Sequence, residues 1–313
     1  MADTLSLVAD PRRGVRDCLS GLLGAGIAAA LAGARSFAAV AQWAGDQDTS
    51  RLARLGLDRA TPPSEATFRR VFTGLDPDVL DGVLGAWFWT RTATVGGRRV
   101  IAIDEKTVRG ARTTSPSGTT EAPHLVAAFD HTAGTVLGQV AVAAKSNEIP
   151  SVRTLLKVLD ITGAVLTLDA MHTQTDTAKA IVDAGGDYVL TVKANQKSLY
   201  AACKRLPWCE VPAHVEVQTG RGRRTLRAVK VTAVPAWIAF HGATQIAQVR
   251  RTVSRAGKKT VEIVYVITSA DHRAAPPAVL AAWIQGHWSI ENRLHWVNPR
   301  ELHQAGENLQ VAC

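Results

Sequence analysis

The sequence contains few cysteines, and none lies where a metal site or a disulfide framework would need it. The four residues are Cys18, Cys203, Cys209 and Cys313, and no two of them form a C-x2-C pair. None lies near a matching pair of histidines. This spacing argues against a structural zinc site and against a secreted domain held by disulfides. We therefore expect a protein of the reducing cytoplasm.

Acidic residues are scarce relative to basic ones. The chain has 27 Asp and Glu against 36 Lys and Arg, which gives a formal net charge of +9. An excess of this size favours a polyanionic partner, and nucleic acid is the first candidate. The alternative is a basic but otherwise ordinary enzyme, and charge alone does not separate the two.

The sequence also lacks an apolar run that is clearly long enough to span a membrane. Residues 18–34 carry no charge and follow several arginines, so the segment resembles the start of an export signal. It is rich in Gly and Ala, however, and falls short of about 20 strongly apolar residues. We predict a buried helix and no membrane association, with an export signal as the alternative.

Residues 1–95 have the pattern of a helical domain, with helices predicted over residues 19–31, 37–43, 65–72 and 77–89. Ser64 is placed to cap the third of these helices. Arg69 and Arg70 lie beside that cap, as they would in a helix-turn-helix reader of DNA. The alternative is a plain helical bundle that supports the next domain.

The pattern changes at Gly96–Gly97 to strands that alternate with helices. Apolar runs at 100–103 and 164–168 predict buried strands, and the elements around them predict an α/β fold. The order of strands and helices over residues 96–204 is that of a ribonuclease H-like core.

Two further regions complete the predicted organisation. Residues 205–270 contain four strand-like segments separated by basic or glycine turns, which predicts an all-β insertion. Residues 271–313 then return to the core with a helix that starts near Pro276 and runs to about Val297.

Three acidic residues stand out by their positions. Asp104 and Asp169 each follow an apolar run, and we expect each to end a buried strand, where sites form in open α/β sheets. Glu291 lies on a helical stripe that is otherwise largely apolar, so it must be neutral, paired or bound to metal. Three converging carboxylates suit two Mg²⁺ or Mn²⁺ ions, which support phosphoryl transfer. The alternative for an acid at a strand end is a cap or turn residue.

The motifs around these acids occur in one order along the chain. They are Ile103–Gly110 (IDEKTVRG), Leu168–Gln174 (LDAMHTQ), Tyr188–Gln196 (YVLTVKANQ), Gly286–Asn292 (GHWSIEN) and the pair His295–Trp296. Together they resemble the insertion-sequence transposases of the DDE type, in the branch that includes the H-repeat-associated proteins. The segments Asp10–Gly14, Leu31–Phe37 and Pro63–Arg69 resemble the helical domain of the same family, so the resemblance covers about residues 10–297.

The resemblance implies a ribonuclease H-like catalytic core with a β insertion before the helix that carries Glu291. It implies that Asp104, Asp169 and Glu291 bind the metal ions. It also implies that the substrate is double-stranded DNA at inverted-repeat ends, cut and joined by a bacterial, nucleoid-associated enzyme. We expect that two copies could pair as a homodimer.

Basic, amide and aromatic side chains near these acids are the predicted DNA contacts. A first set follows the strand next to Asp169, a second flanks Glu291 and a third forms a basic turn in the β insertion. The residues are Lys193, Asn195, Gln196 and Lys197, then His287, Trp288 and Arg293, then Arg221, Arg223 and Arg224. The alternatives are solvated loop lysines, a core tryptophan and a solvated hairpin tip, respectively.

The resemblance ends after Trp296. Pro299 is expected to break the helix two turns after Glu291. The residues that follow look like read-through of a frameshift or a truncation, so we expect an impaired copy; a natural short variant is the alternative. Two rival functions also remain, namely a non-catalytic DNA-binding remnant and a host nuclease of the same fold that cuts but does not join.

Overall fold

The structure is a computed structural model that describes residues 1–13, 16–107, 113–114, 120–122, 124–142, 148–220 and 222–290. Several predictions therefore concern residues outside the described part of the chain. They are the contacts of Arg221 and Arg293, the catalytic role of Glu291, the end of the last helix and the altered tail.

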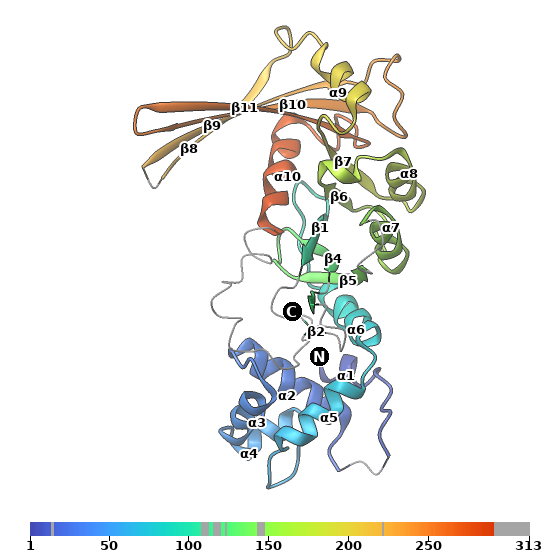
Figure 1. Cartoon of the computed structure of the whole chain (residues 1–313), viewed down its shortest axis with the longest axis vertical. Coiled ribbons are helices and arrows are strands. Elements are labelled where there is room, and N and C mark those ends of the chain that lie inside the picture. Colours follow the sequence, from blue (N-terminus) through green and yellow to red (C-terminus); the bar gives the residue numbers. More distant parts are fainter. Residues whose placement is uncertain are drawn as a thin grey trace.

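The first part of the chain is helical, and its helices pack together below the sheet (Figure 1). They are α1 (Ala2–Leu5), α2 (Leu19–Leu31), α3 (Phe37–Gly45), α4 (Thr49–Arg54), α5 (Glu65–Gly74) and α6 (Pro77–Trp89). The uncharged segment at 18–34 forms α2, whose leucines and alanines are largely buried, so the predicted buried helix is confirmed. Ser64 accepts a hydrogen bond from the Thr67 backbone N–H, which confirms the predicted cap of α5.

Strands β1 (Val100–Thr107), β4 (His124–Asp130), β5 (Val136–Val142), β6 (Val165–Leu168) and β7 (Asp187–Val192) lie at one end of a nine-stranded sheet. The other end is β8 (Ala213–Gly220), β9 (Arg223–Ala233), β10 (Gln245–Arg255) and β11 (Lys258–Thr268). The order across the sheet is β5-β4-β1-β6-β7-β11-β10-β9-β8. The fold is therefore mixed α/β around one large sheet, and the short strands β2 (Thr113–Thr114) and β3 (Thr120–Glu121) pair separately.

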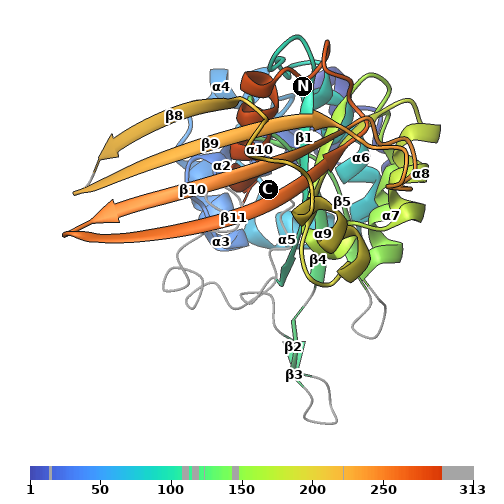
Figure 2. The same cartoon turned by 90° about the horizontal axis from the view of Figure 1, so that it is seen from above.

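Strand direction changes across this sheet. β6 is parallel to both β1 and β7, while β4 is antiparallel to β1 and β11 is antiparallel to β7. Since β11 joins β7 directly, β8 to β11 continue the same sheet. They project beyond the rest of the molecule as a curved four-stranded ribbon (Figures 1 and 2).

Helices cover both faces of the sheet. The helices α7 (Glu148–Val158), α8 (Thr175–Asp183) and α9 (Lys197–Lys204) lie on one face, over a core that includes Ile101 and Ile103. The helix α10 (Pro277–Ile290) lies on the other face, over a core that includes Val100 and Val165. Successive side chains of a strand point to opposite faces, so even-numbered residues of β1 and odd-numbered residues of β6 face α10.

The helical part is joined to the sheet through α6. A Cβ added at Gly85 would lie 2.1 Å from the Leu137 carbonyl oxygen, so only glycine permits this close approach to β5. Asp81 of the same helix accepts a hydrogen bond of 2.9 Å from the Gln139 backbone N–H. No helix in the described part of the chain is long and apolar enough to cross a membrane.

One strand differs from its prediction. The sequence predicted that the first core strand ends at Asp104, but β1 continues to Thr107. The reason is that β1 has two neighbours of different length. Its parallel pairing with β6 ends at Ile103, whereas its antiparallel pairing with β4 includes Asp104 opposite Ala127.

Candidate active site

Asp104 and Asp169 are brought together by the parallel pairing of β1 and β6. Ile103 pairs with Leu168, so each aspartate is the next residue after the last pair of the two strands. Both occupy positions that face α10, because they continue the alternation of Ala102 and Thr167. Asp169 then precedes the short 3-10 turn Ala170–His172, and its side chain is about half exposed.

The loop after β7 lies against Asp169. The Lys193 ammonium is 3.6 Å from an Asp169 carboxylate oxygen, and both side chains are about half exposed, so the pair adds little to stability. The Asn195 amide donates to the Ala170 carbonyl at 2.7 Å, and Gln196 donates to Gln174 at 3.1 Å. These two amides hold the loop against the segment that follows Asp169, which keeps Lys193 beside the carboxylate.

A buried polar network lies beneath the two aspartates. The Thr167 hydroxyl is 2.9 Å from Nδ1 of His287 and 3.2 Å from Nε2 of His131. Thr167 is 2% exposed and His287 is 8% exposed, so a lost partner would leave a polar group in a dry environment. The network joins α10 to β6 and to the turn after β4.

Burial keeps both imidazoles of this network neutral. It lowers the pKa of His131 to about 3, and the neighbouring His287 acts in the same direction. Burial also lowers the pKa of His287, while the carboxylates of Asp104 and Asp169 oppose that shift. Both carboxylates are therefore close enough to His287 to act on its charge.

Gly286 lets α10 lie close to the network. A Cβ at this position would be 2.3 Å from Nδ1 of His131, which is nearer than any side chain can be. The glycine therefore places the next residue, His287, over Thr167. Ile290, the last described residue of α10, packs with Ala102 and Phe129.

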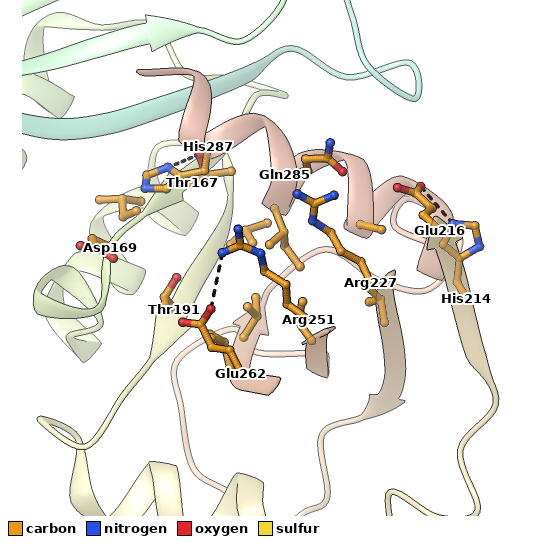
Figure 3. Close-up of a pocket in the computed structure, with 18 of the residues that line it drawn as sticks. Thr167, Asp169, Thr191, His214, Glu216, Arg227, Arg251, Glu262, Gln285 and His287 are labelled. Atoms are coloured by element: carbon orange, nitrogen blue, oxygen red, sulfur yellow. Dashed lines mark hydrogen bonds and ion pairs between the residues drawn. The ribbon is translucent and has the colours of Figure 1, made fainter. Parts of the chain in front are cut away.

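A groove runs from Asp169 along the face of the sheet that α10 covers (Figure 3). Its floor is made of valines from β7, β9, β10 and β11, and α10 supplies Ala281, Ile284, Gln285 and His287 as one wall. Arg227 and Arg251 line the groove on the ribbon, together with His214, Glu216 and Glu262. One groove thus contains a predicted metal ligand at one part and two arginines at another.

The structure places the other predicted contacts in three regions. Lys193, Asn195 and Gln196 form the loop beside Asp169, and Lys197 is the first residue of α9. Arg223 and Arg224 are exposed at the start of β9, at the free end of the ribbon. Trp288 belongs to α10, but its side chain is outside the described set, as are Arg221, Glu291 and Arg293.

Two carboxylates of the predicted triad are thus adjacent, and the third is not described. Among the described residues, no three His, Cys, Asp or Glu side chains gather closely enough to hold a metal ion. The aspartate pair nevertheless suits such an ion, because hard divalent cations take a few carboxylate oxygens and complete their shell with water.

Sequence reasoning missed four residues of this region, namely His131, Thr167, Arg227 and Arg251. Thr167 carried a weak signal, since it is the one polar residue in the apolar run Ala164–Leu168. The two arginines could have been found only from the strand register, because nothing in their local sequence distinguishes them from other arginines of the insertion.

Comparison with known families assigns the class of protein. Residues 95–303 match the family described as transposase DDE domain, and residues 2–88 match the family described as DDE_Tnp_1-associated. The chain belongs to the DDE transposase family. This confirms the resemblance inferred from the motifs.

Individual relatives agree with this assignment. YncI, a candidate transposase of Escherichia coli O157:H7, is 30% identical over 95% of this chain and 78% of its own length. YbfL of Escherichia coli K12 is 30% identical over 95% of this chain and 81% of its own. The H repeat-associated candidate transposase YhhI of the same strain is 34% identical over 63% of this chain and 55% of its own.

Among solved structures, a piggyBac transposase synaptic complex with hairpin DNA covers 93% of this chain and 62% of its own, at 14% identity and a TM-score of 0.40. A likeness this low does not bear on the site, so the assignment rests on the sequence matches.

Proposed function

We propose that this chain is a metal-dependent DNA transposase that cuts and joins DNA at insertion-sequence ends. The observation that carries the proposal is the pairing of Ile103 with Leu168, which sets Asp104 and Asp169 side by side at the carboxyl ends of two parallel strands. Family membership supports it, because both residues lie within the matched region.

The strand arrangement supports a ribonuclease H-like core. The order β5-β4-β1-β6-β7, with β4 antiparallel to β1 and with β6 and β7 parallel to it, agrees with that fold. In this proposal residues 1–95 form a helical domain, 96–204 begin the core, 205–270 are an insertion that lengthens its sheet, and 271–313 return to it.

Asp104, Asp169 and Glu291 would hold two Mg²⁺ or Mn²⁺ ions in this proposal. Such ions activate a water or a 3′-hydroxyl and stabilise the leaving oxygen of a phosphodiester. Glu291 directly follows Ile290, whose packing on Ala102 brings the described end of α10 to the strand that carries Asp104. That placement supports Glu291 as the third ligand.

The remaining side chains would bind and orient the DNA. Lys193 is positioned to hold a phosphate beside Asp169, where its ammonium already lies near the carboxylate. His287 is buried and bonded to Thr167, so it would orient the carboxylate side of the site from beneath. Lys197, Arg223, Arg224 and the undescribed Arg221, Arg293 and Trp288 remain proposed contacts to double-stranded DNA.

A cleavage assay tests the proposal on DNA that carries the inverted repeats flanking the gene. We expect Asp104→Asn and Asp169→Asn to abolish Mg²⁺- or Mn²⁺-dependent cutting and joining. Glu105→Gln is the matched control, because Glu105 neighbours Asp104 but faces the opposite side of β1 towards His124. Equal loss in the control would contradict the assignment.

The same assay separates the rival functions. Cutting without joining would indicate a nuclease, and specific binding without cutting would indicate a DNA-binding remnant. Since an impaired copy would turn over slowly, metal binding is measured as well. We expect Mn²⁺ to raise the unfolding temperature of the unmodified chain and of Glu105→Gln, but not that of Asp104→Asn.

A further inference from the structure

The ribbon β8–β11 carries nearly all of the net charge of the protein. Residues 213–268 contain ten basic residues and two acidic ones, so they hold +8 of the chain's formal charge of +9. The rest of the molecule is close to electrically balanced. An anionic partner is therefore attracted mainly to the ribbon and to the groove that leads from it.

The strand register places arginine directly opposite arginine twice in this ribbon. Arg227 of β9 pairs with Arg251 of β10, and Arg223 pairs with Arg255 four residues farther out on the same face. Like charges directly opposite one another destabilise a sheet. Burial, with Arg251 as a further cause, lowers the pKa of Arg227, which is the sign expected for cations crowded together.

The acidic neighbours of the inner pair neutralise it only loosely. Arg251 is 3.6 Å from Glu262, whose side chain is 60% exposed. Arg227 donates a 2.8 Å hydrogen bond to Gln218, which is uncharged. Glu216 acts on Arg227 at longer range and is itself bonded to His214.

The inner pair lies in the groove that also contains Asp169, Lys193 and His287 (Figure 3). Asp169 adjoins β6, and β7 and β11 separate β6 from β10 in the sheet. With strands about 4.8 Å apart and a rise of about 3.3 Å per residue, the path from Asp169 to Arg251 is roughly 20 Å. That length suits a segment of a few nucleotides.

We propose that Arg227 and Arg251 form a phosphate-binding subsite for an unpaired DNA strand that lies in this groove and leads to Asp169. The inference rests on the proposed function and adds the path of one strand to it. The valine floor fits the apolar faces of sugars and bases, and the arginines fit a phosphate. A duplex does not fit between α10 and the sheet, since the major groove of B-DNA alone is about 12 Å wide.

Binding is measured in EDTA with the full chain, so that its outcome does not depend on cleavage. Two DNAs are compared, one a blunt end duplex and the other the same duplex with an unpaired 3′ extension of several nucleotides. We expect the extension to tighten binding by the unmodified chain. The double variant Arg227→Gln/Arg251→Gln should lose about tenfold or more of that gain, and its salt dependence should fall by about two counterions.

Arg250→Gln is the matched control for Arg251→Gln. Arg250 is the preceding residue, is exposed, and faces away from the groove because it alternates with Arg251 along β10. Its substitution removes the same charge from the same strand, and the variant should keep the full gain from the extension. An equal loss in Arg250→Gln, or an unchanged gain in the double variant, would overturn the subsite.

Two further measurements distinguish the subsite from a folding defect and from a simple anion site. The double variant should unfold at a temperature no lower than the unmodified chain, since it removes a like-charge pair; Arg227→Gln alone leaves the Arg251–Glu262 contact intact and should still lose part of the gain. Inorganic phosphate should compete far less well than the extended DNA, and equal competition would overturn the strand proposal. Failure of cleavage with the extension effect retained would instead count against the proposed function.

Discussion

Thr167 and His287 are 120 residues apart in the chain, and the hydroxyl of one lies 2.9 Å from Nδ1 of the other. This contact ties α10 to the central strand β6 directly beneath the two aspartates. Because Thr167 also contacts His131, one hydroxyl holds together three segments that have no local reason to meet. The stability of this network is open to direct tests.

Thr167→Val should destabilise the protein, because it keeps the shape of the side chain but leaves two buried histidines without their hydroxyl partner. The expected cost is about 1–3 kcal/mol in the free energy of unfolding. Urea unfolding measures it. Thr177→Val is the control: the buried Thr177 hydroxyl has no hydrogen-bond partner among the described residues, so this change should be neutral or stabilising. Similar losses in both variants would show that the network contributes nothing special.

Gly286→Ala should disrupt the seating of α10, because the added Cβ would meet His131 at 2.3 Å. We expect a loss of stability of about 1–3 kcal/mol, as in other overpacked sites, together with weaker Mn²⁺ binding. Gly82→Ala in α6 is the matched change, since no atom lies within 4 Å of its added Cβ. It should raise stability by about 0.5–1 kcal/mol through helix propensity. Thermal unfolding of the two variants side by side gives the answer, and a stabilised Gly286→Ala would refute the close approach.

Asp81 should make stability depend on pH in the weakly acidic range. Burial raises the pKa of Asp81 to about 6, despite the hydrogen bond from Gln139 that lowers it. The folded state therefore holds its proton more tightly than the unfolded state, whose pKa is near 4. Stability from this group is complete below about pH 4 and is lost as the pH rises through about 6.

Asp81→Asn should remove this dependence, because the amide keeps an oxygen to accept from Gln139 and carries no charge. At pH 7 the variant should be more stable than the unmodified chain by up to about 3 kcal/mol. Chemical unfolding at pH 4, 5, 6 and 7 checks the prediction. Parallel pH curves for the two proteins would mean that Asp81 ionises normally in the folded state.

DNA binding should depend strongly on salt and only modestly on Asp104→Asn. If four phosphates are neutralised, affinity should fall about a hundredfold between 50 and 200 mM salt. The basic ribbon lies apart from Asp104, so loss of that carboxylate should leave the salt slope unchanged. Titration of labelled DNA at several salt concentrations measures both quantities, and binding that ignores salt would speak against an electrostatic contact.

The sequence alone was enough to predict the elements and the two adjacent aspartates, because both depend on local physics. Apolar runs bounded by acids indicate buried strands that end near a site, and Ser64 caps its helix through neighbouring atoms. The α10 face of Asp104 follows from the alternation of side chains along β1. The motifs around the acids were also enough to predict the family.

Only the tertiary structure decided which distant side chains meet. The extension of β1 beyond Asp104 required a longer partner on one side than on the other, which a single strand's sequence does not encode. The meeting of His131, Thr167 and His287 required the packing of α10 on β6, made close by Gly286. The arginine pairs of the ribbon arise from strand register, and a slip of one residue would have turned them to the opposite face.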